Sequence, residues 1–131
     1  MAKVIYLIRG LPGAGKSTLA EHIVERCCRH AADDYFMVEQ GKGKFKYVFD
    51  KTKLPEAHIA CLNAVKKNIA DCQPKIVVAN TFVKKEHMKP YYDLAAEHGY
   101  EVGAIIVKSN FRSIHGVPQS TIDKMREEFE V

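Results

Sequence analysis

Gly10-Leu11-Pro12-Gly13-Ala14-Gly15-Lys16-Ser17 is a glycine-rich segment near the N-terminus that matches the pattern G-x-x-x-x-G-K-[ST] completely. The apolar run at 4–8 predicts a buried strand before it, and the composition of 17–21 predicts the start of a helix after it. This strand–loop–helix context is the one in which the pattern binds the phosphates of a nucleotide.

The chemistry of the segment follows from its residue types. Glycines let the backbone approach a phosphate closely, and the peptide N–H groups converge on the anion at the helix N-terminus. Lys16 adds a charge at the β- and γ-phosphates, and the Ser17 hydroxyl is placed to bind Mg²⁺. A dinucleotide fold is disfavoured because Lys16 follows Gly15. We predict that ATP with Mg²⁺ contacts Gly10, Leu11, Pro12, Gly13, Ala14, Gly15, Lys16, Ser17 and Thr18.

Length and composition limit the remaining possibilities. The 131 residues predict one domain, residues 1–131, and the formal net charge of +4 is too low to indicate nucleic-acid binding by itself. No apolar run has the length of a membrane span and no secretory signal is visible, so we expect a cytoplasmic protein without a membrane partner. The four cysteines lack metal-type spacing and predict buried free thiols; the scattered histidines indicate no metal site beyond Mg²⁺.

Apolar strands alternate with helical patterns along the whole chain. Further strands are predicted at 75–79 and 102–107. Helices are predicted at about 16–29, 55–71 and 84–98, with a last one after Pro118 that has Ile122, Met125 and Phe129 on one face. This order predicts an α/β fold of the P-loop three-layer type, with a central, mostly parallel sheet, helices on both faces and a short lid.

Two acidic residues follow the first predicted helix. Asp33, with Asp34 beside it, is expected where the second strand ends, and parallel sheets bind ligands at that edge. A carboxylate there can take a proton from an acceptor hydroxyl or orient it toward the γ-phosphate. The alternative, an aspartate pair that caps a turn, has about equal weight.

Arginines are the candidates for stabilising phosphate charge. Arg112, with His115 nearby, lies in a turn after the last strong strand, where a guanidinium could close over the phosphates. A solvated surface arginine is an equally good interpretation. Arg126 on the last helix could face the same site, whereas Arg9 could form an ion pair below the loop.

Seven segments in a fixed order carry a family resemblance. They are 8–20, Ala32-Asp33-Asp34-Tyr35-Phe36, Tyr47-Val48-Phe49-Asp50 before Leu54-Pro55-Glu56-Ala57-His58, Val77-Val78-Ala79-Asn80-Thr81-Phe82, His87-Met88-Lys89-Pro90-Tyr91, Glu97-His98-Gly99-Tyr100-Glu101-Val102 and Arg112-Ser113-Ile114-His115-Gly116-Val117-Pro118. The chain thereby resembles the polynucleotide-kinase-like P-loop kinases, in the branch of AAA-type ATP-binding proteins. The resemblance implies an ATP–Mg²⁺ donor, a hydroxyl acceptor, Asp33 as general base, Lys16 and Ser17 at the phosphates and metal, and Arg112 as lid arginine.

The chain departs from that family at several positions. Phe36 stands where relatives carry an arginine that holds the acceptor phosphate, and Asn80 follows Ala79 where many relatives have an aspartate. Asn80 could still position a water or the metal shell. Only residues 108–111 separate the strand from the lid arginine, and Glu128 stands where relatives often carry another arginine.

The segment around Lys42, Lys44 and Lys46 has two interpretations. If it is extended, the lysines share one face and aromatic rings the other, which suits a nucleic-acid acceptor. A solvated hairpin tip is the favoured alternative.

These observations lead to one main functional hypothesis and two alternatives. The first is an ATP-dependent kinase that phosphorylates a hydroxyl, with a polynucleotide 5′-OH as one candidate acceptor. The others are an ATP-binding module with little catalysis that acts through partner recognition, and a kinase of a small nucleoside-like or modified-base acceptor. The acceptor and the oligomeric state stay open.

Overall fold

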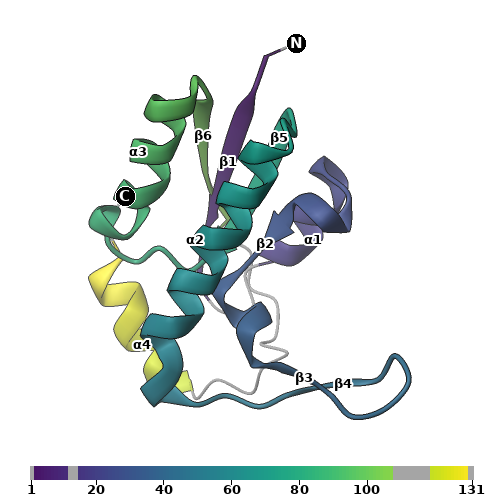
Figure 1. The fold of residues 1–131 in the computed structure, drawn as a ribbon. Helices are drawn as coiled ribbons and strands as arrows, with labels where there is room; N and C mark the ends of the chain where they lie inside the picture. The colour runs from purple at the N-terminus through teal and green to yellow at the C-terminus, as the bar shows by residue number, and fades with distance from the viewer. Residues whose placement is uncertain (1, 12–14, 108–118, 130–131) are drawn as a thin grey trace.

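A computed structural model describes residues 2–11, 15–107 and 119–129 and has a four-stranded parallel sheet at its centre (Figure 1). The strand order is β2-β5-β1-β6. The strands are β1 (Val4–Arg9), β2 (Arg29–His30), β5 (Lys75–Asn80) and β6 (Glu101–Ile106). In register, Ile8 of β1 lies between Ala79 and Ile105. The carboxyl ends of the two central strands therefore meet at one edge of the sheet.

Helices cover both faces of the sheet (Figure 1). Ile5 and Leu7 pack on one face with α2 (Leu54–Ala70) and α3 (Lys89–His98). Ile8 packs on the opposite face with α1 (Lys16–Ile23). Since the central strands are buried from both sides, they are apolar throughout rather than alternating. The predicted α/β class and its parallel sheet are confirmed.

The end of the first helix was predicted wrongly. The helix stops at Ile23 instead of continuing to Arg29, and Val24 is extended, with φ −140° and ψ 163°. The short 3-10 turn η1 (Arg26–Cys28) then leads into β2. Ile23 and Val24 are β-branched, which weakens a helix, and both pack against the sheet. Tertiary packing of this pair therefore ends the helix early.

The cysteines only partly fulfil their prediction. All four are free thiols, but Cys27 and Cys72 are exposed, and only Cys28 and Cys61 are buried. Cys27 and Cys28 lie in the turn η1 and not on a helix as predicted. Burial is the main cause that raises the pKa of the Cys28 thiol to about 11. This thiol is therefore a packing group at neutral pH rather than a nucleophile.

The remaining helices follow the predicted pattern with small shifts. The region predicted at 84–98 divides into the 3-10 turn η4 (Lys85–Met88) and α3, with Pro90 in the first turn of α3. Gly99 ends α3 in the left-handed conformation at φ 73°, as expected of a C-terminal glycine. The last helix is α4 (Gln119–Glu128). No helix in the described parts of the chain is long and apolar enough to cross a membrane.

A small hairpin projects from the body of the domain, and we call residues 37–47 the arm (Figure 1). Its strands β3 (Met37–Glu39) and β4 (Phe45–Tyr47) pair antiparallel, apart from the main sheet. Gly41 at φ 132° and Gly43 at φ 73° allow its turn, conformations that side chains rarely adopt. The arm lies between the 3-10 turns η2 (Ala32–Phe36) and η3 (Lys51–Lys53).

Candidate functional site

The glycine-rich loop leaves β1 and enters α1 at the carboxyl edge of the sheet. Gly15 adopts the left-handed conformation at φ 96°, and its carbonyl accepts the first helical hydrogen bond from the Leu19 N–H at 3.1 Å. The Gly10 N–H donates to the Thr81 carbonyl at 3.3 Å, which ties the loop to the end of β5. Pro12, Gly13 and Ala14 lie outside the described residues. The described ends of the loop thus stand where open parallel sheets bind ligands.

Lys16 extends its ammonium group across this loop. Its Nζ donates to the Gly10 carbonyl at 2.8 Å and to the Leu11 carbonyl at 3.0 Å. Burial lowers the pKa of Lys16 to about 8, and the negative charge of Asp33 acts against that shift. Asp33 therefore lies close enough to Lys16 to interact with it electrostatically. The site brings together the two residues that the sequence assigned to phosphate and to proton transfer.

Asp33 and Asp34 point to different sides. The Tyr47 hydroxyl donates to Oδ1 of Asp33 at 3.1 Å, whereas the Ala31 N–H donates to Oδ2 of Asp34 at 3.1 Å. Desolvation raises the pKa of Asp34, and the hydrogen bond from Ala31 opposes it. Burial, followed by the charge of Asp33, raises the pKa of Tyr47, so its phenol stays protonated and donates. In the described part of the chain, the charge that acts on Lys16 and the bond from Tyr47 of the arm both belong to Asp33.

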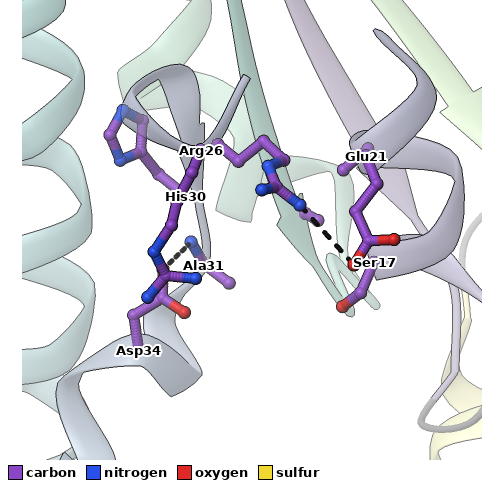
Figure 2. Close-up of a pocket in the computed structure, with 9 residues that line it drawn as sticks. Ser17, Glu21, Arg26, His30, Ala31 and Asp34 are labelled. Carbon is purple, nitrogen blue, oxygen red and sulfur yellow. Dashed lines mark hydrogen bonds and ion pairs between the residues drawn. The ribbon is translucent and has the colours of Figure 1, made fainter. Parts of the chain in front are cut away.

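Asp34 lines a cavity of about 290 Å³ between α1 and β2 (Figure 2). Ser17 lies on the opposite wall, and Ala79 at the end of β5 also contributes. The full lining is Ser17, Ala20, Glu21, Arg26, Arg29, His30, Ala31, Asp34 and Ala79. Serine and carboxylate oxygens are ligands that suit Mg²⁺, which is usually bound by one or two protein groups together with substrate phosphates. Among the described residues, no group of three or more His, Cys, Asp or Glu could hold a metal without such phosphates.

Asn80 is buried behind Asp33. Its Oδ1 accepts a hydrogen bond from the Ala32 N–H at 2.7 Å, and its Nδ2 lies 3.9 Å from the Cys61 sulfur. Both ends of the amide thus contact protein groups. These contacts hold the chain immediately before Asp33 against the end of β5.

Three arginines were considered as groups that could stabilise the negative charge of the phosphates. Arg112, with its neighbour His115, lies outside the described residues. Arg126 lies on α4, with Nη1 3.5 Å from Oδ1 of Asp123 in the same helix. Arg9 is buried, and its Nε and Nη2 donate to the Phe82 carbonyl at 3.1 and 2.9 Å. Arg9 thus ties the end of β1 to the residues that follow β5.

Sequence reasoning missed two neighbours of Asp33. Tyr47 was treated only as part of a basic segment, and His58 on α2 was not considered. Burial lowers the pKa of His58, as does nearby His87, while Asp33 opposes the shift. Tyr47 and His58 are 14 and 25 positions from Asp33, and no motif spacing links them to it. Tertiary structure alone brings them together.

Comparisons with known proteins agree with this geometry. Residues 5–114 match the family described as AAA domain, so the chain belongs to this family of P-loop kinase-like domains. NEDD4-binding protein 2 of Homo sapiens is 32% identical over 139 residues, which cover 97% of this chain. The chain spans about 8% of the length of that relative.

A solved structure supports the same fold. The APS kinase of Mycobacterium tuberculosis, solved as a cysteine mutant, superposes with a TM-score of 0.51 at 18% identity. The likeness covers 97% of this chain and 93% of that chain. The domain therefore has the nucleotide-binding fold of P-loop kinases.

Proposed function

We propose that this domain is an ATP-dependent kinase that transfers the γ-phosphoryl group of ATP to a hydroxyl acceptor. The observation that carries the proposal is the electrostatic contact between Lys16, which spans the loop, and Asp33, which faces it. A phosphate-binding cation and a carboxylate at one edge of the sheet are the two groups that such a transfer needs. The shared sheet and its covering helices support treating residues 1–131 as one P-loop kinase-like domain.

In this mechanism the loop and Lys16 hold the phosphates of ATP. Ser17 would bind Mg²⁺, which neutralises phosphate charge when it is present, and Asp34 faces the same cavity. Asp33 accepts the proton of the acceptor hydroxyl while the oxygen of that hydroxyl forms a bond to the γ-phosphorus. The bond from that phosphorus to the bridging oxygen breaks, and ADP leaves. Tyr47 orients Asp33 through its hydrogen bond, and Arg112 is proposed as the lid arginine.

A second candidate is an ATP-binding module with little catalysis that acts through a partner. The observation that favours it is Ala79, which lines the cavity beside Ser17 and brings no carboxylate there.

In either case we propose a cytoplasmic location, because a reducing compartment suits four free thiols.

The decisive experiment uses labelled ATP and Mg²⁺ with 5′-OH oligonucleotides, with nucleosides, or with no acceptor. Label on oligonucleotides supports a polynucleotide kinase, and label on nucleosides supports a small-acceptor kinase. Tight ATP binding without any transfer supports the module.

Asp33→Asn should abolish transfer and change ATP affinity little at about pH 7, because it removes the base and not the phosphate contacts, and Lys16 stays mostly charged there. Asp34→Asn is the matched control and should keep most of the transfer rate if its carboxylate is not the base. An undiminished rate in Asp33→Asn would remove Asp33 from this role.

A further inference from the structure

Three aromatic rings beside Asp33 form a connected group, which we call the aromatic platform: Phe36, Tyr47 and Phe49. Phe36 is buried, and its ring centroid lies 6.2 Å from that of Tyr47 and 5.2 Å from that of Phe49. The rings of Tyr47 and Phe49 are nearly parallel, with an interplanar angle of 16° and centroids 6.4 Å apart. Alternate residues of an extended chain point to the same side, so the two rings lie next to each other on Phe36.

The platform is buried at Phe36, half-buried at Tyr47 and exposed at Phe49. Phe49 is 52% exposed, which is unusual for a phenylalanine that is held in place by two other rings. The Val48 N–H donates to the Phe36 carbonyl at 2.8 Å, so the backbone also fixes the platform. Tyr47 connects the platform to Asp33 through its hydroxyl. An acceptor whose hydroxyl reaches Asp33 would therefore lie beside these rings.

Lysines predominate in the chain segment that contains Tyr47 and Phe49, whereas Asp33 lies at the hydroxyl of Tyr47. Residues 42–53 contain Lys42, Lys44, Lys46, Lys51 and Lys53 against the single acid Asp50. All five lysines are exposed. This segment carries +4, as much as the formal net charge of the whole chain, so the remainder is neutral overall. With Glu39 counted, the arm and the turn that follows the platform, residues 37–53, still carry +3 of the net charge of +4.

We infer that the arm and the aromatic platform bind a single-stranded nucleic acid, with a base stacked on Tyr47 and Phe49 and phosphates along the lysines. The inference rests on the proposed function, which places the acceptor hydroxyl at Asp33. Exposed aromatic rings beside a basic track are the features that bind unpaired bases without sequence preference. A duplex offers phosphates to the lysines but no free base face to the rings. An acidic peptide likewise offers charge alone.

The test measures binding, so that it does not depend on catalysis. Fluorescence anisotropy would follow a labelled single-stranded oligothymidylate with a free 5′ hydroxyl, in ADP and Mg²⁺, between about 50 and 200 mM salt. Phe49→Ala should weaken binding roughly 10-fold, and Phe49→Trp should restore it, whereas Phe49→Leu should not. The same substitutions should leave binding of a duplex unchanged.

The lysines are tested by charge removal. The triple variant replaces Lys42, Lys44 and Lys46 by Gln. Each lost phosphate contact lowers the slope of log Kd against log salt by about 0.7, so the slope should fall by about 2. Replacing Lys66, Lys67 and Lys75 by Gln is the matched control, because it removes the same charge from exposed positions elsewhere. Circular dichroism would confirm that each variant is folded.

Three outcomes would overturn the inference. Phe49→Ala could bind the single-stranded oligonucleotide as tightly as the wild type, or the two triple lysine variants could lose equal affinity for it. Polyglutamate could also bind the wild type as tightly as the oligonucleotide does. Transfer of phosphate to nucleosides combined with arm-independent oligonucleotide binding would keep the proposed kinase and reject the inference. If binding of the single-stranded oligonucleotide depends on the rings but no acceptor is phosphorylated, the inference is kept and the proposed kinase is rejected.

Discussion

The phosphate side of the site and the side that carries Asp33 are built from different kinds of contact. On the phosphate side, backbone groups dominate: Gly10 bonds the Thr81 carbonyl, and Lys16 bonds two loop carbonyls. On the other side, the Tyr47 and Asp33 side chains bond each other, and the rings of the platform are partly exposed. Backbone contacts depend little on residue identity outside the motif, whereas side-chain contacts change with each substitution.

Under the proposed function, this difference would let substitutions change the acceptor without changing the nucleotide. The phosphate side belongs to the central strands, most of whose apolar residues are fully buried. The other side consists of the 3-10 turn η2, the arm and the start of α2, which share a small separate core of Ala32, Phe36 and Ala57. A smaller core yields more readily to substitution, and binding residues often lie on such segments. We therefore expect variants of the two sides to have separable effects.

Asn80 joins the two sides, so its removal should have the largest effect on stability. Asn80→Ala leaves the buried Ala32 N–H without its acceptor, which should cost about 1–3 kcal/mol of unfolding free energy. Urea denaturation would measure this change. The rate of transfer should also fall, because the chain before Asp33 is released. The exposed Asn63→Ala is the control, with an expected change within about 0.5 kcal/mol.

Tyr47→Phe changes the side of Asp33 without changing the phosphate side, because it keeps the ring and removes only the hydrogen bond to Asp33. We expect kcat to fall roughly 10-fold, as for loss of a hydrogen bond to a charged group. Isothermal titration should give an unchanged ATP affinity. Tyr35→Phe is the matched control, because its hydroxyl donates to Glu56 instead. A parallel loss of ATP affinity in Tyr47→Phe would mean that the two sides are not separable.

The strands and the helix start around the glycine-rich loop could be predicted from the sequence for a physical reason. The loop is a local pattern, and the strands around it are continuous apolar runs that read clearly without knowledge of the fold. The strand β2 is harder to detect, since it has two residues, Arg29 and His30, and no apolar run. Likewise, the early end of α1 depends on how Ile23 and Val24 pack against the sheet.

The side of Asp33 was predicted only in part. The aspartate pair could be found from its place after the second strand, but only the family resemblance, and no local pattern, distinguishes Asp33 from Asp34. The hydrogen bonds from Tyr47 and from the Ala31 N–H make that distinction. His58 reaches the same place because α2 packs over η2. Roles that arise from such long-range contacts require the folded structure.

The smallest effect concerns the phosphate side alone, through the titration of Lys16. Burial holds the pKa of its ammonium near 8, and bound phosphates favour the charged form and so raise that pKa. ATP affinity should therefore be full below pH 8 and decline as the pH rises through 8. From a pKa of about 8, we expect Kd for ATP to rise about 4-fold between about pH 7 and pH 8.5. Calorimetry near pH 8 should also detect uptake of about half a proton on binding.

Lys16→Arg is the control for this titration, because a guanidinium stays charged throughout the same range. The variant should bind ATP more weakly, since arginine cannot reproduce the two bonds from Nζ to the loop carbonyls, but its Kd should not change with pH. An equal rise of Kd in both proteins would assign the titration to another group. Tyr47→Phe should keep the wild-type pH dependence of ATP binding, because Tyr47 bonds Asp33 and not the loop. A shifted dependence in that variant would show that the charge of Asp33 links the two sides through Lys16.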